Sequence, residues 1–446
     1  MTWFVRLCGT SMRAACMILR VIELGIAAAV FATCTFCVFF RSVLLHKSDT
    51  PGKLILSRVS VRLLLGLGGI APKIGQILST RPELLGDHIA SIFLPTRDSC
   101  TLVAPGRVRR IVAKWERHHP GTLVLRPGSR NVIGIGAVAQ IHLADLVSFE
   151  QPVAVKILKP DATERWLSDL RLISIFAGLA ERAMRSFGFA TSVGFEVIRR
   201  ELNSHRLLCD EARSLKTISQ QLSRYVNVRF PFLHSALCTS QILVLEYIPG
   251  LVQIDSPEVP KAVAERAMRC GLEFVFRSIF DIGVVHCDLH PGNLLIDNQG
   301  RLTIVDFGGC AVLSDDVRKD FREFFYCIAT GNAKAGAELL LKGARPYGSC
   351  RPAQSQCGFI EDLKLLFISF SSRRIREFRV CDFVRQLIDI HGRHCLIASA
   401  DFLTVILALM VVEGSAIRII PDTDLFLMAK RILRTPLNGG TIARAT

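Results

Sequence analysis

The sequence lacks several patterns that mark common classes of protein. Its 446 residues hold no internal repeat and no low-complexity segment, so a repeat architecture is excluded. Only one Cys-x-x-Cys pair occurs among the 15 cysteines, at residues 34–37 inside an apolar run, and a zinc site is not expected. The cysteines fit small apolar side chains in a reducing compartment. With 4 tyrosines and no Lys/Arg run interleaved with aromatic residues, nucleic-acid binding is not expected either.

The sequence is rich in apolar residues and in positive charge. Hydrophobic residues make up 50% of the chain, and the formal net charge is +16. A basic and apolar protein is expected to contact anionic lipid surfaces or nucleotide phosphates. A chain of this length can bury a large core, and we expect two or three domains or lobes.

Two uncharged stretches are candidates for membrane contact. Residues 24–40, which lie between Glu23 and Arg41, reach the lower limit of length for a membrane-spanning helix. Three interpretations are open for them: a membrane helix, an interfacial anchor, or an apolar helix packed on the fold. Residues 402–412 are too few to span a bilayer, and they predict a buried core helix.

The most informative stretch is His-Cys-Asp-Leu-His-Pro-Gly-Asn at residues 286–293, followed by Asp306-Phe-Gly. Asp288, Asn293 and Asp306 stand at the spacing of a kinase phosphoryl-transfer site. Mg²⁺ prefers carboxylate and amide oxygens, so Asn293 and Asp306 are the predicted metal ligands. Asp288 is the predicted catalytic residue, facing the attacking hydroxyl group or water.

A predicted β-hairpin connects the two metal ligands. Residues 293–296 and 302–305 are short apolar, β-branched runs, and Asp-Asn-Gln-Gly at residues 297–300 is a turn signal. Paired strands on either side of this turn would bring Asn293 and Asp306 to the same end of the hairpin.

Residues 131–158 predict a nucleotide-binding lobe. Two strands are expected there, joined by a loop of small residues whose backbone can approach phosphates. The loop residues are Gly134, Gly136, Ala137, Val138 and Ala139. Lys156 closes a Val-Ala-Val-Lys strand, and we predict that it contacts the α- and β-phosphates of ATP.

A helix glutamate and a hinge complete the predicted nucleotide site. In kinases the strand lysine is held by a glutamate on a helix. Both Glu201 and Glu211 lie on a helical pattern after Lys156, and only one of them is expected to reach it. The strand at residues 242–247 predicts a hinge, where Glu246 and Ile248 offer backbone groups to adenine.

The complete set resembles the UbiB/AarF-like atypical kinases over about residues 50–435. Besides the motifs above, the matching strings are Lys73-Ile-Gly-Gln76 with Ile-Leu-Ser-Thr-Arg-Pro after it, Leu245-Glu-Tyr-Ile-Pro-Gly250, and Glu413-Gly414. The Lys-x-Gly-Gln element is specific to this family.

The resemblance implies a fold and an organisation for the chain. The fold is α+β, a protein-kinase-like bilobal fold with an N-terminal helical extension. The implied segments are a hydrophobic N-terminal segment at 1–45, which could anchor to a membrane, a helical extension with the Lys-x-Gly-Gln element at 46–120, a kinase-like N-lobe at 121–250 and a C-lobe with a helical C-terminal region at 251–446.

The resemblance also implies an activity and a setting. ATP and Mg²⁺ are the implied cofactors. Lys73 and Gln76 are implied to project into the active-site cleft and to restrict access by protein substrates, and Glu211 is implied to pair with Lys156. The implied setting is cytoplasmic and membrane-associated, in support of ubiquinone or related isoprenoid-quinone and lipid metabolism. The implied partners are membrane lipids and quinone-pathway proteins or lipid intermediates.

Two departures from the family pattern affect these expectations. The family's Glu-x-Asp element stands here as Glu201-Leu-Asn203, which loses a carboxylate. The chain ends soon after the Glu413 helix, so a C-terminal membrane hairpin found in some relatives is not expected. We expect residues 24–40 to take its place.

Two further features argue against a broad protein kinase. Cys287 stands where kinases carry the catalytic-loop arginine, so a phosphorylated activation loop has no obvious receptor. No Ala-Pro-Glu follows Gly308, which leaves little room to dock a peptide. Both features favour a small-molecule kinase or a regulated ATPase. The alternatives are another small-molecule phosphotransferase and a non-catalytic nucleotide-binding pseudokinase that scaffolds a complex.

Overall fold

The computed structural model describes the chain in two compact units. The units are Met1–Ile173 and Ser174–Thr446. The described residues are 19–27, 50–67, 71–73, 75, 93, 102–126, 131–136, 138–147, 151–159, 165–172, 208–346, 352–370 and 380–435. The division at residue 173 falls inside the predicted N-lobe of 121–250, and the four predicted segments stay predictions.

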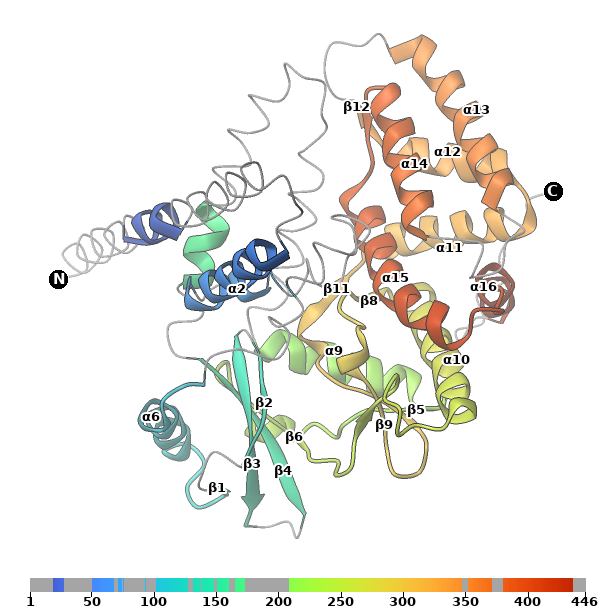
Figure 1. Cartoon of the computed structure of the whole chain (residues 1–446). Coiled ribbons are helices and arrows are strands. Elements are labelled where there is room, and N and C mark those ends of the chain that lie inside the picture. The colour runs from blue at the N-terminus through green and yellow to red at the C-terminus, as the bar shows by residue number, and fades with distance from the viewer. Residues whose placement is uncertain are drawn as a thin grey trace, which may run out of the picture. The chain divides into compact units, whose positions relative to one another are not determined.

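The first unit contains an antiparallel sheet centred on β3 (Figure 1). Its strands are β1 (Leu123–Leu125), β2 (Val132–Ile135), β3 (Ala139–Leu146) and β4 (Pro152–Leu158). The strand β4 pairs along one edge of β3, while β1 and β2 share the other edge. The expected pair of strands around a small-residue loop is therefore confirmed as the β2–β3 hairpin.

Helices accompany this sheet in the first unit. They are α2 (Thr50–Leu67), α6 (Pro105–Glu116) and helical segments at residues 19–27 and 165–172. Val108, Val112 and Trp115 are the buried residues of α6, and their spacing places them on one face of the helix. The amide of Val103, just before α6, donates to Oε1 of the buried Gln140 on β3 at 3.0 Å, which ties the start of the helix to the sheet.

A buried ion pair holds the N-terminal helical segment to the rest of the first unit. The guanidinium of Arg20 donates to both carboxylate oxygens of Asp169, at 2.6 and 2.8 Å, and also to the carbonyl oxygen of Leu67 at 2.6 Å. Burial by itself lowers the pKa of an arginine, but the hydrogen bonds to Asp169 and Glu23 raise the pKa of Arg20. Of the apolar segment predicted at 24–40, only residues 24–27 lie within the described residues, at the end of this helix.

The second unit carries a sheet of short strands in the order β5-β10-β9-β7. These strands are β5 (Val228–Arg229), β7 (Val252–Gln253), β9 (Leu294–Ile296) and β10 (Leu302–Ile304). The same unit also contains α9 (Leu208–Leu222), β6 (Ile242–Glu246), β8 (Val284–His286) and β11 (Cys310–Val312). The strand β8 pairs antiparallel with β11, which places His286 opposite Cys310.

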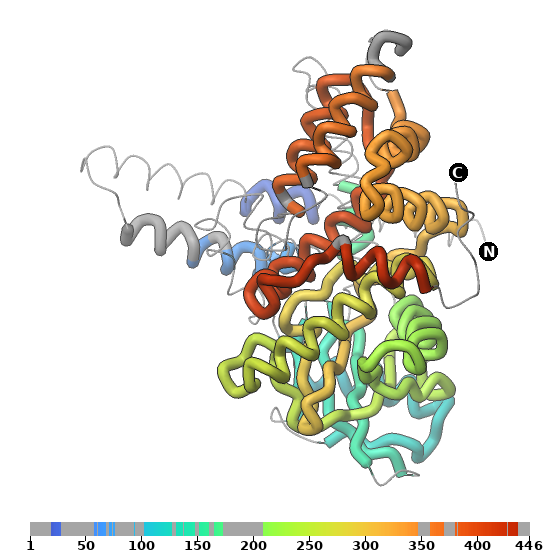
Figure 2. Tube along the Cα trace, turned by 90° about the vertical axis from the view of Figure 1, so that its right-hand side faces the viewer, coloured from blue at the N-terminus to red at the C-terminus, as the bar shows by residue number. Residues whose placement is uncertain are grey.

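The rest of the second unit is helical, and Figure 2 shows α11 to α16, coloured orange to red, packed together. The helices are α10 (Lys261–Arg277) with a π-helical turn (Ser278–Ile282), α11 (Asp315–Thr330), α12 (Ala333–Gly343), α13 (Pro352–Phe370), α14 (Val380–Arg393), α15 (Ala400–Ile419) and α16 (Leu425–Arg434). The short strands β12 (Arg345–Pro346) and β13 (Leu396–Ile397) pair beside them.

Local sequence signals explain where these helices begin. The side chains of Ser314, Asn332, Ser399 and Asp424 accept hydrogen bonds from backbone N–H groups in the first turns of α11, α12, α15 and α16. Stacked and edge-on phenylalanine rings, among them Phe321, Phe324 and Phe402, fill the core between α11, α13 and α15.

The predicted buried helix at residues 402–412 forms part of α15. This helix is 20 residues long and apolar enough to cross a membrane by composition, but its apolar window is 67% buried in the fold. That burial confirms the expected core helix. Cysteines were expected to be reduced apolar side chains. Cys395 is an exception, because it is disulfide-bonded.

The buried ion pair should carry much of the stability of the first unit. We predict that Asp169→Ala lowers the free energy of unfolding by about 3 kcal/mol, because it leaves the buried Arg20 charge with only the half-exposed carboxylate of Glu23 as a partner. Denaturant unfolding measures this change. Asp145→Ala, which removes the half-exposed partner of Arg126, is the control and should stay close to wild type. Equal effects of the two substitutions would contradict the assignment.

Candidate nucleotide and metal site

The predicted hairpin is present. The strands β9 and β10 pair antiparallel, with Ile304 opposite Leu294 and Leu302 opposite Ile296. One residue beyond, the amide of Val305 donates to the carbonyl oxygen of Asn293 at 3.2 Å. Asn293 and Asp306 therefore leave the hairpin at the same end, as predicted from the two apolar runs and the turn.

The orientation of the Asn293 side chain is fixed by the catalytic loop. This side chain is buried, and its amide nitrogen donates to the backbone carbonyl oxygen of Asp288 at 2.8 Å. The nitrogen is thereby engaged inside the loop, and Oδ1 is the atom left to serve as a ligand. A short 3-10 turn over Pro291–Asn293 supports the arrangement, because His290 accepts the Gly292 N–H at 3.0 Å.

Asp306 has a strained backbone. Its φ of 59° and ψ of 76° lie in the left-handed region, which is uncommon for a residue with a Cβ atom. Its Oδ1 accepts the N–H of Gly308 at 3.2 Å, so the carboxylate caps the 3-10 turn Phe307–Gly309. Strain of this kind concentrates at functional sites, where the surrounding structure enforces it.

His286 lies close to Asp288 and Asp306. Its ring is buried, packs edge-on against Phe307, and accepts the N–H of Asp288 on Nδ1 at 3.3 Å. Burial lowers the pKa of His286 to about 4, although the charges of Asp288 and Asp306 act in the opposite direction. The imidazole is therefore neutral near pH 7 and carries its proton on Nε2.

Glu211 lies close to the Asp306 turn. This carboxylate is 4% exposed on α9, and α9 packs against the 3-10 turn Phe307–Gly309. Burial raises the pKa of the Cys310 thiol, and the negative charge of Glu211 raises it further. Glu211 and Cys310 are therefore near neighbours. Glu201, the other candidate for the helix glutamate, lies outside the described residues.

The side chain of Glu246, one of the two hinge candidates, is held by contacts within the protein. Glu246 forms an ion pair with Arg229 at 2.5 Å and accepts the N–H of Phe232 at 3.1 Å. Arg229 also approaches Asp297 in the turn of the β9–β10 hairpin, at 3.4 Å. The Glu246 side chain is thus engaged within the protein, and so is its backbone N–H, which donates to the Phe232 carbonyl oxygen at 2.8 Å. Ile248, the other hinge candidate, is buried.

In the first unit, the predicted lysine and loop residues lie on the β2–β3–β4 sheet. Lys156 pairs with Ile141 of β3, and Val153, Val155 and Ile157 are buried on the opposite face of β4. Lys156 therefore leaves the sheet on the face shared with Ala154.

The structure explains why small residues occur at Gly134 and Gly136 of the loop. A Cβ at Gly134 would approach the Ile141 side chain to 3.2 Å, and the Gly136 N–H donates to the Ala139 carbonyl at 2.8 Å to close the turn. Val138 continues this turn by accepting the N–H of Lys159 at 2.8 Å. Ala137 lies outside the described residues.

Lys73 is buried, with only 6% of its surface exposed, in a helical turn of the first unit. A buried lysine is costly unless its charge is compensated, so a buried Lys73 agrees with a specific role rather than a solvent-facing one. Gln76, its predicted companion, lies outside the described residues.

Comparison with known proteins identifies the family. A model of the "ABC1 atypical kinase-like domain" matches residues 97–340. The chain belongs to the ABC1 atypical kinase-like family. This confirms the resemblance drawn from Lys156, the catalytic loop and the Asp306 motif, and with it the α+β, protein-kinase-like fold.

Several relatives of this ABC1-family chain are named. A "Probable protein kinase UbiB" of Marinobacter nauticus is 24% identical over 82% of this chain and 67% of that protein. The Arabidopsis thaliana "Protein ACTIVITY OF BC1 COMPLEX KINASE 1, chloroplastic" is 25% identical over 56% of this chain and 37% of that protein. The chain thus spans about two thirds or less of the length of these relatives. Among solved structures, the Rv3197–erythromycin complex from Mycobacterium tuberculosis aligns with a TM-score of 0.45 and 16% identity, covering 84% of this chain and 99% of that one.

Two contributors to the ABC1-family site were not assigned a role from the sequence. His286 begins the catalytic loop, but its buried, neutral ring became evident only from the packing of Phe307 against it. Arg229 follows a short strand with no motif, and its bridge to Glu246 and Asp297 depends on contacts distant in the chain. A histidine two residues before Asp288 was the one available signal.

The low pKa of His286 predicts how stability depends on pH. Between pH 6.5 and about 4 an unfolded chain takes up a proton on this histidine while the folded chain does not, so folding is stabilised above pH 6.5 and loses that term as the pH falls. The full difference is at most about 3 kcal/mol. We predict that His286→Gln flattens the loss of unfolding free energy across this pH range, while the exposed His118→Gln keeps the wild-type slope. Parallel slopes for all three proteins would disprove a buried neutral His286.

Proposed function

We propose that this chain is an Mg–ATP-dependent phosphotransferase or ATPase that works at a membrane surface in support of ubiquinone or related isoprenoid-quinone metabolism. The observation that carries the enzymatic part is the convergence of Asp288, Asn293 and Asp306 on one end of the β9–β10 hairpin. Family membership supports nucleotide binding of the kinase type.

The donor atoms at this end of the hairpin fit a magnesium ion. Asp306 supplies a carboxylate and Asn293 an amide oxygen, both of which are hard ligands. Across the described ranges no group of three or more His, Cys, Asp or Glu side chains could hold a metal by itself. Two protein oxygens suit Mg²⁺, which usually takes its other ligands from water and nucleotide phosphates. When bound, the ion would neutralise phosphate charge.

The remaining residues have roles that follow from their chemistry. Asp288 would accept the proton of the attacking hydroxyl group or water as the γ-phosphoryl group is transferred. Lys156 would hold the α- and β-phosphates, and backbone groups near Glu246 and Ile248 would hold adenine. In the proposal, Glu211 and Lys73 compensate charge at the site, and Lys73 with Gln76 limits access to it.

The chain beyond Asp306 favours a small acceptor or water over a peptide. Residues Cys310–Val312 form β11, and α11 begins at Asp315 with its Ser314 cap. The strand β11 is used to pair with β8 and leads directly into the helix. In addition, Cys287 is buried where kinases carry an arginine. These features support a small-molecule kinase or ATPase rather than a broad protein kinase.

Two surfaces of the first unit support a membrane setting. The helical segment at residues 19–27 buries Arg20 and exposes Leu19, Ile22 and Ile26 by 61, 51 and 60%, at the spacing of one helix face. Solvent-exposed apolar side chains in such a stripe suit insertion into the interfacial region of a bilayer.

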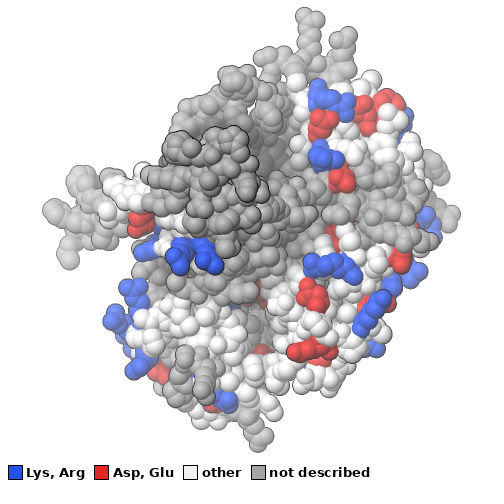
Figure 3. Space-filling model, in the orientation of Figure 1, with Lys and Arg blue, Asp and Glu red and all other residues white. Residues whose placement is uncertain are grey.

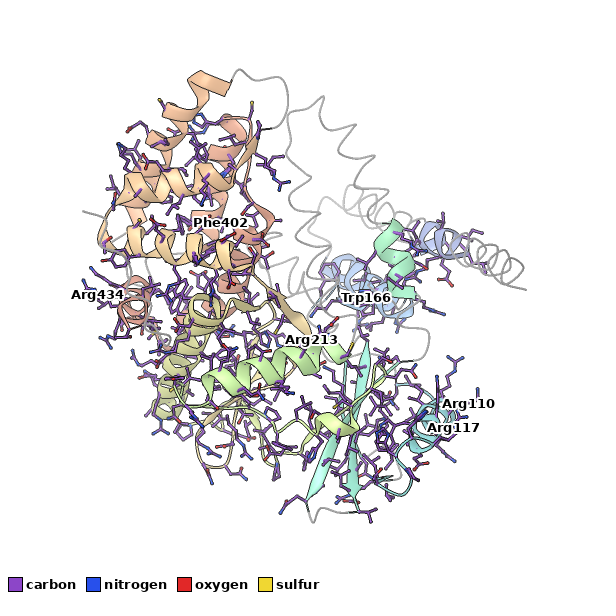
Figure 4. All side chains as sticks on the ribbon, turned by 180° about the vertical axis from the view of Figure 1, so that it is seen from behind. Arg110, Arg117, Trp166, Arg213, Phe402 and Arg434 are labelled. Carbon is purple, nitrogen blue, oxygen red and sulfur yellow. The ribbon has the colours of Figure 1, made fainter. Side chains whose placement is uncertain are left out.

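The second surface is the outer face of α6. The helix has the sequence PGRVRRIVAKWE, with one acidic residue against four basic ones, and Arg117 follows it. Figure 3 shows Lys and Arg side chains gathered over α6, and in Figure 4 the labelled Arg110 and Arg117 extend away from the protein. Each basic side chain near an anionic lipid surface contributes about 1 kcal/mol of attraction.

The link to quinone metabolism comes from the resemblance to the UbiB/AarF-like family. A "Probable protein kinase UbiB" among the relatives supports this part of the proposal. Quinone-pathway proteins or lipid intermediates are the proposed partners.

The enzymatic proposal predicts a specific loss in Asp288→Asn. Removing the carboxylate that accepts the proton should lower kcat for ATP by about 10²- to 10⁴-fold while leaving Mg–ATP affinity within about twofold. The assay is ATP hydrolysis and phosphate transfer with and without anionic vesicles. Asp316→Asn, an exposed carboxylate at the start of α11, is the control and should match wild type. A wild-type protein that neither binds nor turns over ATP would overturn the enzymatic proposal.

The membrane proposal predicts that charge reversal on α6 weakens vesicle binding. We expect Arg109→Glu with Arg110→Glu to weaken flotation with phosphatidylglycerol vesicles by about tenfold or more, and added salt to weaken wild-type binding. The matched control reverses two exposed charges of the second unit, Lys334→Glu with Arg385→Glu. Ile22→Asp should weaken binding to neutral and anionic vesicles alike, because it acts through apolar contact. If none of these changes affects binding, the proposed membrane contact of both surfaces is contradicted.

A further inference from the structure

The helical region of the second unit encloses an apolar cavity that is separate from the nucleotide site. It lies among α10, α11, α13, α14, α15 and α16, and the centre of a water-sized sphere can occupy about 50 Å³ of it. A space of about 10–15 Å³ by this measure holds one water molecule, so the cavity has room for a few methylene groups. None of the residues that line it belongs to the predicted nucleotide or metal site.

The walls of this cavity are almost entirely hydrocarbon. Five phenylalanines line it, together with leucine, isoleucine, valine and alanine side chains from α10, α11, α14, α15 and α16. The five are Phe276, Phe324, Phe325, Phe367 and Phe383. Helical spacing puts these side chains on the inner faces, as for Leu425 and Ala429 one turn apart on α16.

The single charged residue in the wall is engaged by the protein. Oε1 of Glu413 accepts the backbone N–H of Val380 at 2.7 Å, at the first residue of α14. A carboxylate is stabilised at a helix N-terminus, so this contact gives Glu413 a structural use in holding α14 to α15. It does not make the cavity a polar site.

This wall chemistry determines what can occupy the cavity. A buried water needs two to four polar partners, and the carbon lining does not offer them. A peptide segment would bury N–H and C=O groups without hydrogen bonds, which is costly. A hydrocarbon chain has no such requirement and gains from every apolar contact.

The open side of the cavity lies at α15 and α16. Of the lining residues, Leu409 on α15 and Leu425 on α16 are only partly buried, while those from α10, α11, α13 and α14 are buried. The C-terminal end of α16 is fastened, because Arg277 and Arg322 donate to the carbonyl oxygens of Thr435 and Leu433 at 3.4 and 3.5 Å. The mouth therefore borders the N-terminal half of α16.

We propose that this cavity binds the end of the hydrocarbon chain of a lipid, either acyl or prenyl, which enters between α15 and the N-terminal half of α16. The proposal rests on the proposed membrane setting for the source of the chain, and it is independent of the chemistry at Asp288, Asn293 and Asp306. It gives the helical region of the second unit a binding role of its own.

The test uses the full-length protein and dansyl-undecanoic acid as a fluorescent probe. Wild-type protein should bind the probe saturably, with one equivalent per chain and blue-shifted emission. Ala429→Phe places a ring inside the cavity and should weaken probe binding by about tenfold or more, in the range that misfit in apolar pockets produces. Leu427→Phe adds a ring to an exposed position of the same helix and should bind as wild type does.

Further arms keep the test decisive. Leu409→Phe fills the cavity from the opposite wall, so it replaces Ala429→Phe if that variant fails to fold by thermal unfolding. Competition by palmitate and by geranylgeraniol distinguishes acyl from prenyl chains. Absence of saturable binding by the wild-type protein, or equal binding by filled and wild-type proteins, would overturn the proposal. ATP binding is measured in parallel: probe binding without ATP binding would remove the enzymatic proposal alone, and the reverse would remove the cavity proposal alone.

Discussion

The register of the β9–β10 hairpin is the constraint on which the rest of the site depends. Because Ile304 pairs with Leu294, the two chain segments that leave the hairpin carry Asn293 and Asp306 at one end. A shift by one residue would turn every side chain to the other face of the strands and separate the two oxygen donors. The buried turn at Asp297, whose side chain accepts the amides of Gln299 and Arg301, and its contact with Arg229 hold the opposite end of the hairpin. The short strands are thus fixed from both ends.

Burial around this hairpin sets the electrostatics of the site. His286 is kept neutral by its surroundings, so it can accept the Asp288 amide and pack against Phe307 without adding a positive charge next to the proposed metal ligands. Glu211 is buried against the same turn, and Asp306 is held in a left-handed conformation. Each of these features costs stability when taken singly, and the surrounding core of α9 and α10 and the paired strands β8 and β11 offsets that cost. A site assembled in this way is pre-organised before nucleotide binds.

The sequence predicted those parts whose signals are local. The hairpin followed from two β-branched runs and an Asp-Asn-Gln-Gly turn. Parts that depend on distant contacts could not be predicted. The Arg20–Asp169 pair joins segments 149 residues apart, and it shows that the described start of the apolar N-terminal region is attached to the fold. The ion pair of Glu246 with Arg229 and the apolar cavity beside α16 likewise arise only when several elements pack together. The kinase-like identity was predictable because its motifs are short strings of chemically required residues.

The central claim is that Asn293 and Asp306 form the metal end of an Mg–ATP site. It is tested most directly by titration calorimetry of ATP with and without Mg²⁺, comparing wild type, Asp306→Asn and the control Asp315→Asn, an exposed carboxylate at the start of α11. The account predicts that Mg²⁺ strengthens ATP binding in wild type and in Asp315→Asn but has little effect in Asp306→Asn. ATP binding that Mg²⁺ leaves unchanged in wild type, or strengthens equally in Asp306→Asn, would contradict it.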